Sequence, residues 1–225
     1  MKGNIKMDNK EIIKMSAHEI NSPIAVIHGY ADLIDCGIVK GDNARTMAGK
    51  IKKEAKRLSR LVDEMSVFTG IMEGSIYSER VLFEIRDVFQ TAIDKARENT
   101  RKDFYIEVFG SGSMYGNKEL FKILITHIIE NAVIYNESEE RKILCKISPL
   151  EDKLVITIDD NGVGIKEQER EAVFECFYRE NKEHSRKLGG NGMGLAICKE
   201  IAKAEGMNIF ISDSALSGTR VTIEK

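Results

Sequence analysis

Two stripes of apolar residues run along the first third of the chain, with alternating spacings of four and three positions. The first stripe is Ile13, Ala17, Ile20, Ile24, Ile27, Ala31 and Ile34. The second stripe is Ala44, Ala48, Ile51, Ala55, Leu58, Val62, Met65, Thr69 and Met72. Such heptad spacing predicts two long helices within residues 8–73. Between them, Gly37 can end the first helix, and Asp42 or Asn43 can cap the second.

Two helices with one apolar stripe each make a hairpin but not a closed core. Two hairpins together close a four-helix bundle, so the pattern predicts a homodimer through residues 8–73. The alternative is a hairpin that packs on the rest of its own chain. We favour the dimer because the two stripes are narrow and long.

After residue 80, short apolar runs alternate with helical stretches. The predicted strands are residues 81–85, 104–108, 143–147, 154–158, 208–212 and 219–223. The predicted helices are residues 86–98 and 117–136, with another helix after Asn191. This mixed order predicts an α+β sandwich over residues 80–225, with one helical layer on one sheet. Gly70, Gly74 and Ser75 indicate a short hinge before it.

The composition is that of an ordinary globular protein. The 225 residues are 42% hydrophobic and 31% charged, which fits one or two domains and argues against disorder. A net charge of −2 does not indicate a nucleic-acid or anionic-membrane partner. The sequence has no apolar run of about 18 residues and no apolar signal core, so no membrane contact is expected within the chain. Four cysteines without metal-ligand spacing favour reduced thiols and a cytoplasmic location.

The first candidate site follows the start of the first helix. His18 lies about 100° beyond Ala17 on the helix, which turns its imidazole away from the apolar stripe. An exposed imidazole can act as a nucleophile or a base, and Glu19 beside it can orient the ring or take its proton. Ser22 lies one turn later on the same face. Pro23 removes the helical donor of the Glu19 carbonyl, so we expect it to interrupt the helix, and a break beside a reactive group suggests a functional irregularity. An ordinary surface histidine is the plainer interpretation.

Two glycine-containing stretches are candidates for nucleotide binding. In the first, a strand ends at Asp160 and is followed by Gly162 and Gly164; the carboxylate can accept a hydrogen bond from a purine amino group. In the second, Gly192 and Gly194 lead into a helix, whose free amides can face phosphate. Neither stretch has the spacing of a P-loop or a Rossmann fingerprint. A plain glycine-rich loop is the alternative for both.

The predicted helix at 117–136 contains a candidate metal ligand. Asn131 and Tyr135 share one face, and the Asn131 oxygen is of the type that Mg²⁺ prefers. A solvated helical asparagine is the plainer interpretation. A basic, helix-poor segment lies between the two glycine stretches and can either fold over an anion or remain a solvated loop: it contains Arg179, Lys182, Arg186 and Lys187.

Together these motifs resemble the catalytic core of a bacterial sensor histidine kinase. MSAHEINSPIAVIHGYADLI is similar to the phosphoacceptor box of that family, HIIENAVIYN to its N box and DDNGVGI to its G1 box. AVFECFYRE resembles the F box, GGNGMGLAI the G2 box and Ser217-Gly218-Thr219 the last glycine motif. The motifs occur in family order and cover nearly all of residues 8–225. Each is weak alone, but six in order make chance an implausible explanation.

The resemblance implies a dimeric four-helix bundle for histidine phosphotransfer, residues 8–73, and an ATP-binding sandwich of the histidine kinase/Hsp90-type ATPase fold, residues 80–225. It implies that ATP phosphorylates His18, with Glu19 as acid/base partner, and that an aspartate of a response regulator then takes the phosphoryl group. Ser22 stands where family members often carry a residue used to dephosphorylate the regulator. Either the chain is an excised core that lacks a sensor or membrane anchor, or it is a soluble kinase fed by another protein.

For the nucleotide, the resemblance implies that Asp160 binds adenine, Asn131 holds Mg²⁺ and Tyr135 lines the pocket of ATP. The other residues expected to bind or shape the cofactor site are Gly162, Gly164, Arg179, Gly192, Gly194, Leu195 and Thr219. Two positions depart from the family pattern. His127 stands where a first asparagine of the N box is usual, and Ile134 stands where a phosphate-contacting cation is common.

Two rival functions use the same residues. One is a serine/threonine kinase or ATP-driven clamp with the same nucleotide fold. ATP-hydrolysing relatives usually carry glutamate one turn before the N-box asparagine, and His127 at that position argues against hydrolysis. The other rival is a non-catalytic dimeric scaffold that binds a regulator but not ATP. His28 is a second candidate phosphoacceptor, but it flanks the apolar stripe and lacks an acidic neighbour, so we favour His18.

Overall fold

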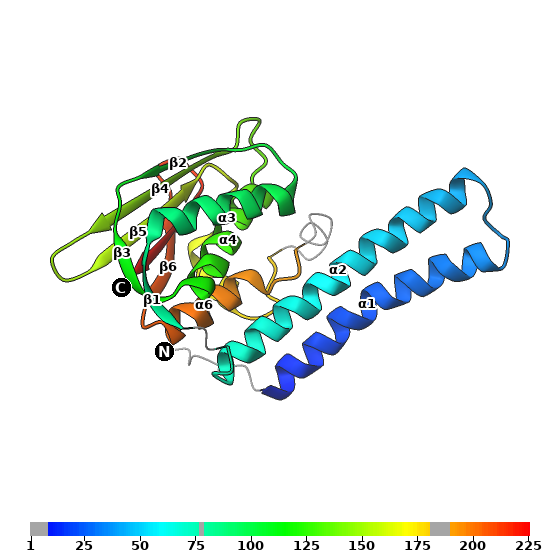
Figure 1. The fold of residues 1–225 in the computed structure, drawn as a ribbon. Helices are drawn as coiled ribbons and strands as arrows, with labels where there is room; N and C mark the ends of the chain where they lie inside the picture. Colours follow the sequence, from blue (N-terminus) through cyan, green and yellow to red (C-terminus); the bar gives the residue numbers. More distant parts are fainter. Residues whose placement is uncertain (1–8, 77–78, 181–189) are drawn as a thin grey trace. The chain divides into compact units, whose positions relative to one another are not determined.

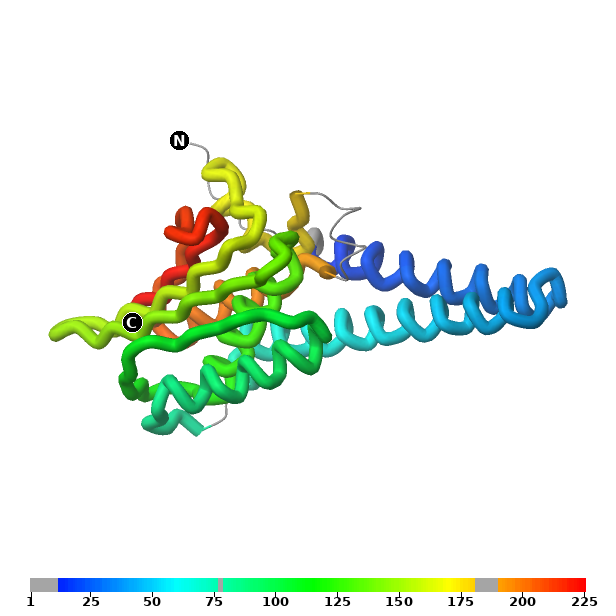
Figure 2. Tube along the Cα trace, turned by 90° about the horizontal axis from the view of Figure 1, so that it is seen from above, coloured from blue at the N-terminus to red at the C-terminus, as the bar shows by residue number. Residues whose placement is uncertain are grey.

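The computed structural model describes residues 9–76, 79–180 and 190–225. The chain divides into two compact units, Met1–Ser66 and Val67–Lys225. α1 (Asn9–Asp35) and α2 (Asp42–Met72), whose last residues belong to the second unit, run antiparallel and side by side, as Figures 1 and 2 show. Gly37, at a φ of 67°, lies in the turn between them. The predicted hairpin is confirmed. None of the described helices is long and apolar enough to span a bilayer.

The two helices are more continuous than the sequence suggested. Pro23 lies inside α1 without ending it, so the expected break beside the candidate site is wrong. Gly70, expected in a hinge, is a buried residue of α2, and only Gly74 and Ser75 follow the end of that helix. A proline or glycine penalty of about 1–3 kcal/mol is small for helices of 27 and 31 residues, whose remaining hydrogen bonds and packing keep them helical.

The apolar stripes are only partly covered within one chain. Ile27 and Leu58 are half-buried, whereas Ile13 is 68% and Val62 is 46% exposed. The alanines of the stripes are largely exposed as well: Ala17, Ala31, Ala48 and Ala55. Each stripe is therefore wider than the contact between the two helices, and it leaves apolar surface along the hairpin.

The second unit contains a five-stranded sheet in the order β2-β4-β5-β7-β6 and a two-stranded antiparallel sheet of β1 and β3. In the larger sheet, β2 is parallel to β4 and the other neighbours are antiparallel. The strands are β1 (Arg80–Glu84), β2 (Tyr105–Phe109), β3 (Ser113–Asn117), β4 (Lys142–Pro149), β5 (Leu154–Asp160), β6 (Asn208–Asp213) and β7 (Thr219–Glu224). The α+β sandwich is confirmed, with β1 and β3 as an addition to its single sheet.

Three helices cover one face of the larger sheet: α3 (Ile85–Thr100), α4 (Lys118–Ile134) and α6 (Gly194–Ala204) (Figure 1). The sequence of α4 is apolar almost all round, and most of its residues are buried, as expected for the middle helix of a layer. Asn117 caps α4 by accepting a hydrogen bond from the Leu120 N–H at 3.0 Å. Short 3₁₀ turns, Glu167–Glu169 and Ala172–Phe174, follow the sheet on the way to α6.

The unpredicted strand β3 is short and mixes polar residues with Gly116. Such a segment has no alternating apolar pattern, so its strand form depends on pairing with β1. Pairing of two strands far apart in sequence is a tertiary effect that local periodicity does not encode.

Candidate functional site

On the hairpin, His18 is exposed on α1 and Glu19 beside it is buried. Oε2 of Glu19 lies 3.7 Å from the Arg57 guanidinium of α2, and Arg57 also lies 3.6 Å from the Glu54 carboxylate. The structure thus directs Glu19 across the hairpin, while the histidine faces outward. Ser22 is half-buried one turn after His18. His28 is also exposed, so exposure alone does not separate the two histidines.

In the sandwich, Asp160 ends β5 and is 8% exposed. Its Oδ1 accepts hydrogen bonds from the backbone N–H groups of Gly162 at 2.8 Å and Thr219 at 3.0 Å. Burial raises the pKa of this carboxyl, although the two backbone donors act against the rise. Because both donors bind the same oxygen, the second oxygen is left to accept from a ligand. This is the geometry needed to recognise an amino group.

Glycines allow the backbone to close around this carboxylate. A Cβ on Gly218 would overlap the carbonyl oxygen and Oδ1 of Asp160, and a Cβ on Gly162 would lie 3.0 Å from the same Oδ1 and from the Tyr135 carbonyl. Gly164 adopts a φ of 73°, which favours glycine. The end of α4 and the loops after β5 and before β7 therefore meet at Asp160, as the motifs required.

Two asparagines that we did not single out hold this loop in place. Asn161 Oδ1 accepts hydrogen bonds from Asn136 Nδ2 and from the Lys142 N–H, both at 2.7 Å. Asn161 Nδ2 donates to the Glu140 carbonyl at 2.9 Å, and Asn136 is almost completely buried. Both residues lie inside the quoted motifs, directly after Tyr135 and Asp160. These positions were the signal from which the sequence could have predicted their role. An asparagine that supports a loop and one that binds a ligand look alike in a sequence.

The other half of the site is built on α4 and α6. Asn131 and Tyr135 are both half-buried near the C-terminal end of α4, and the Tyr135 N–H donates to the Asn131 carbonyl at 3.0 Å. Lys102 Nζ donates to the Ile134 carbonyl at 3.2 Å, so a cation does lie at this end of the helix although position 134 is apolar. Burial, with a smaller effect of Arg141, lowers the pKa of Lys102.

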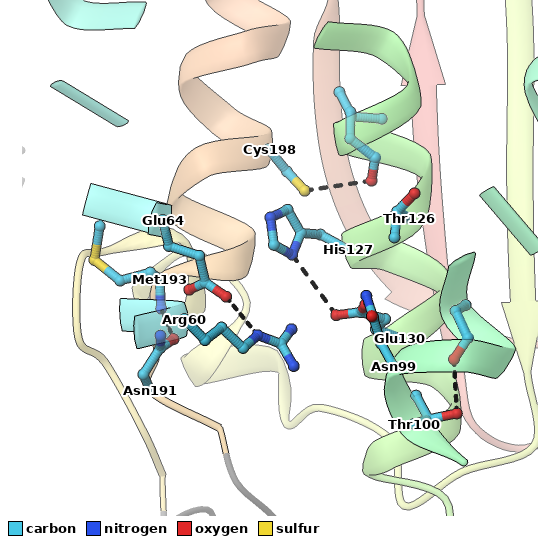
Figure 3. A network of polar contacts seen from close by, with 12 residues as sticks. Arg60, Glu64, Asn99, Thr100, Thr126, His127, Glu130, Asn191, Met193 and Cys198 are labelled. Carbon is cyan, nitrogen blue, oxygen red and sulfur yellow. Dashed lines mark hydrogen bonds and ion pairs between the residues drawn. The ribbon is translucent and has the colours of Figure 1, made fainter. Parts of the chain in front are cut away.

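The histidine that departs from the family pattern belongs to a polar network (Figure 3). His127 Nδ1 lies 4.0 Å from Oε2 of Glu130, and Asn99 Nδ2 of α3 donates to Oε1 of Glu130 at 2.5 Å. The His127 ring also lies beside the first residue of α6, since a Cβ added to Gly194 would lie 3.3 Å from Nδ1. The imidazole therefore stands beside the helix N-terminus at which phosphate is expected.

The loop before α6 is fixed by the segment that resembles the F box. Phe177 N–H donates to the Gly192 carbonyl at 2.8 Å, and Gly192 has a φ of 80° with no room for a Cβ against Phe177. Asn191 Oδ1 accepts from the Met193 N–H at 3.1 Å. Arg179 is buried and donates to the Gly190 carbonyl at 3.5 Å, so it supports this loop. Leu195 lies in the first turn of α6.

The structure thus brings together Asp160, Gly162, Thr219 and Tyr135 at one end, and Gly194 and His127 at the other. The predicted basic residues Lys182, Arg186 and Lys187 lie outside the described residues. Among the described residues, no group of three or more histidine, cysteine, aspartate or glutamate side chains could hold a metal ion. A metal at Asn131 would therefore need further ligands, which water or a bound nucleotide can supply.

Family models match both parts of the chain. The His Kinase A (phospho-acceptor) domain matches residues 8–73, and the Histidine kinase-, DNA gyrase B-, and HSP90-like ATPase matches residues 116–225. Sensor protein kinase WalK of Staphylococcus haemolyticus is 28% identical over 226 residues, which cover 97% of this chain. The chain spans 37% of the length of that relative.

Solved structures show the same fold. Histidine kinase AdeS of Acinetobacter baumannii has a TM-score of 0.72 at 20% identity, covering 92% of this chain and 96% of its own. Histidine kinase ThkA, solved in complex with response regulator protein TrrA, has a TM-score of 0.72 at 21% identity, covering 95% of this chain and 60% of its own. With both domains matched and in this order, the chain belongs to the sensor histidine kinases, with a phospho-acceptor domain followed by a histidine kinase-type ATPase domain.

Proposed function

We propose that the chain transfers the γ-phosphoryl group of ATP to His18 and then to an aspartate in the receiver domain of a response regulator. The observation that carries the proposal is the exposed imidazole of His18 within the segment matched by the phospho-acceptor family model. We assign residues 8–73 to dimerisation and phosphotransfer and residues 80–225 to ATP binding. The complex of ThkA with TrrA supports a response regulator as the partner.

In the ATP-binding domain, the free oxygen of Asp160 accepts a hydrogen bond from the adenine amino group. The amides at the start of α6, after Gly192 and Gly194, bind phosphate oxygens. Asn131 would hold Mg²⁺ through its amide oxygen, a ligand type that this ion prefers. The metal, when bound, neutralises charge on the phosphates. Tyr135 closes the site between Asn131 and the loop of Gly162.

At His18, one ring nitrogen attacks the γ-phosphorus, the P–N bond forms, and the bond to the ADP oxygen breaks. The proton on the other ring nitrogen is then acidic, and the Glu19 carboxylate holds or accepts it. Oε2 of Glu19 pairs with Arg57 in this structure, so we expect the carboxylate to turn from Arg57 to the imidazole during the reaction. Ser22, one turn away, is placed to orient water in a regulator that docks on the same face.

A second copy of the hairpin covers the exposed stripe that contains Ile13 and Val62, which gives the homodimer. Val62→Glu tests this assignment, because the side chain is 46% exposed in a single chain and its replacement should not unfold the hairpin. The unmutated protein should scatter light as a dimer, and the variant should shift to the monomer mass because a dimer would bury its charge. A monomer mass for the unmutated protein contradicts the dimer.

The free cysteines support a reducing, cytoplasmic location for this part of the protein. All four are thiols, and burial raises the pKa of Cys145 and Cys176 to about 12. Such thiols are inert packing groups that need no oxidising compartment.

The deciding experiment is incubation with Mg·ATP labelled at the γ-phosphate. The expected product is an acid-labile, base-stable phosphate on His18, located by peptide mapping. The label should then pass to an aspartate of an added receiver domain. Phosphate that survives acid would point to a serine or threonine kinase, and a chain that neither binds ATP nor incorporates label would favour the scaffold.

A further inference from the structure

We propose that Glu205 is a positioning residue for the nucleotide, and that Arg80 of β1 controls it. The Glu205 carboxylate joins the ends of α4 and α6 that lie away from the proposed phosphate site, so that the placement of β1 sets the affinity for ATP. The inference rests on the proposed binding of ATP by residues of α4 and α6. It adds a contact, remote from the nucleotide, through which that affinity can be changed.

The helices α4 and α6 pack against each other and run antiparallel. At the proposed phosphate site, the His127 ring lies beside Gly194, the first residue of α6. One turn further along α6, the Cys198 thiol donates to the Leu124 carbonyl oxygen at 3.6 Å (Figure 3). A nucleotide that binds to both helices depends on their spacing, because a displacement of about 1 Å is enough to impair the positioning of a reacting group.

Glu205 completes this contact at the opposite end of the helix pair. It directly follows α6, and only 5% of its side-chain surface is exposed. Its Oε2 accepts a hydrogen bond at 3.2 Å from the N–H of Asn117, the residue that caps α4. A Cβ on Gly116 would lie 2.5 Å from the same oxygen, so a larger residue there would displace the carboxylate. One carboxylate thus joins the end of α6 to the start of α4, about 16 Å along α6 from its first residue.

Arg80 supplies the closest cation to this buried carboxylate. Its guanidinium lies 3.1 Å from Oε2 of Glu205, and in the small sheet Arg80 is paired directly with Asn117. The Lys225 ammonium lies farther away, at 3.9 Å, and donates to the carbonyl oxygens of Tyr115 and Glu205. A buried carboxylate that loses a cationic partner is strongly disfavoured. Displacement of β1 would therefore disturb Glu205, and with it the contact between α4 and α6.

The position of β1 in the chain gives this contact a regulatory role. β1 is the next helix or strand along the chain after α2 ends at Met72. A change in the segment that connects them therefore reaches β1 before any other strand of the ATP-binding domain. The Arg80 side chain is 46% exposed, so burial does not fix its position. Coupling between two sites is reciprocal, so if displacement of β1 weakens ATP binding, bound ATP must in turn stabilise β1.

The test uses the full chain and calorimetry with Mg²⁺ and a non-hydrolysable ATP analogue. Arg80→Gln should weaken binding about fivefold, the lower end of the range for coupled sites, in protein that urea titration shows to be folded. A merely structural role would lower the free energy of unfolding and leave this affinity unchanged. Arg80→Lys keeps the cation and should restore most of the affinity. Lys153→Gln is the matched control, because it removes a cation that is 48% exposed and 3.0 Å from the Glu224 carboxylate, and it should leave the affinity unchanged.

Two further measurements do not depend on the stability of a single variant. In the Glu205→Gln background, Arg80→Gln should have no additional effect on affinity, because the charge with which it pairs is gone. In the unmutated chain, the bound nucleotide should slow hydrogen exchange of the β1 backbone amides.

The outcomes separate this inference from the proposed function. The role of the Arg80–Glu205 pair is overturned, while ATP binding stands, by an unchanged affinity in folded Arg80→Gln or by an equal loss in Lys153→Gln. An Arg80→Gln effect that persists in full in the Glu205→Gln background overturns it too, as does exchange of the β1 amides that the nucleotide leaves unchanged. Failure of the unmutated chain to bind the nucleotide overturns both this inference and the proposed function.

Discussion

Asp160 in the sandwich and His18 on the hairpin are the two groups on which the proposed reaction depends, and the chain holds them in opposite ways. Asp160 is 8% exposed, and two backbone N–H groups fix one of its oxygens, with two glycines, Gly162 and Gly218, packed closely against it. His18 is exposed, and its acidic neighbour is held by a side chain of the opposite helix. Recognition of one fixed ligand needs a rigid acceptor. Transfer to and from two partners needs a group that both can reach.

This contrast predicts that the two groups can be separated by mutation. His18→Gln should abolish phosphorylation completely while leaving ATP affinity unchanged, because a glutamine amide is not a nucleophile for phosphorus and Asp160 is untouched. Radiolabel incorporation and calorimetry on the same preparation measure the two effects. His28→Gln is the control and should remain active. Label retained in His18→Gln but lost in His28→Gln would move the phosphoacceptor to residue 28.

The close packing around Asp160 can be disturbed without changing a charged residue. Gly218→Ala should weaken ATP binding by more than tenfold and lower the free energy of unfolding by about 1–3 kcal/mol, since the added Cβ overlaps the backbone and side chain of Asp160. Gly49→Ala in α2 is the matched control, because nothing lies within 4 Å of its new methyl group. That control should instead gain up to about 1 kcal/mol of helix stability. Equal behaviour of the two variants would contradict the close packing at Asp160.

The acceptor itself can be tested apart from its packing. In Asp160→Asn the amide oxygen can still accept from Gly162 and Thr219, but the amide nitrogen then meets the adenine amino group, donor against donor. The loss of one hydrogen bond to a charged group is about 1.5–3 kcal/mol, or about 10- to 150-fold in Kd. Calorimetry with ATP and with inosine triphosphate, which has an acceptor at this position, checks the assignment. Inosine triphosphate should bind the variant better than ATP does.

Burial of Asp160 also has a consequence for stability. Burial raises the pKa of its carboxyl in the folded protein, so the folded state binds this proton more tightly than the unfolded state does. The contribution of the Asp160 carboxyl to the free energy of unfolding is therefore most favourable below the usual pKa of aspartate. It is lost as the pH rises through the raised pKa of the folded state. Asp160→Asn removes this loss, so its stability relative to the unmutated chain should increase from acid to neutral pH in urea titrations. A constant difference would mean that the carboxyl is not destabilised by burial.

Some features of the hairpin and the sandwich could be predicted from the sequence and others could not, for a physical reason. The hairpin, the sandwich and Asp160 follow from local periodicity and from glycines whose spacing has a steric purpose. The pairing of Glu19 with Arg57 depends on the rotation of two helices, and strand β3 depends on a distant partner. The break expected at Pro23 was wrong because neighbouring turns sustain the helix. Local sequence patterns did not predict the contacts between segments that are distant in the sequence.

The smallest effect concerns how firmly Glu19 is held. Arg57→Gln removes the cation 3.7 Å from its carboxylate, a partly buried pair for which about 1 kcal/mol is reasonable. If Glu19 must leave Arg57 to reach the imidazole, its release should speed single-turnover phosphorylation by a few-fold at saturating ATP, with ATP affinity unchanged. Arg57→Lys keeps the charge and should stay near the original rate.

A matched loss of charge elsewhere on the same helix completes the test. Lys50, whose ammonium lies 5.1 Å from the Tyr30 ring centre, is also a cation of α2 that contacts α1. Lys50→Gln should therefore leave the rate unchanged, so a gain seen in both variants would reflect net charge. A slower reaction in Arg57→Gln, with the rate restored in Arg57→Lys, would mean that the pair positions Glu19 for catalysis. Glu19 would then be held in a fixed position as Asp160 is. Of the groups in the proposed reaction on the hairpin, the exposed His18 imidazole would be the one left free to meet different partners.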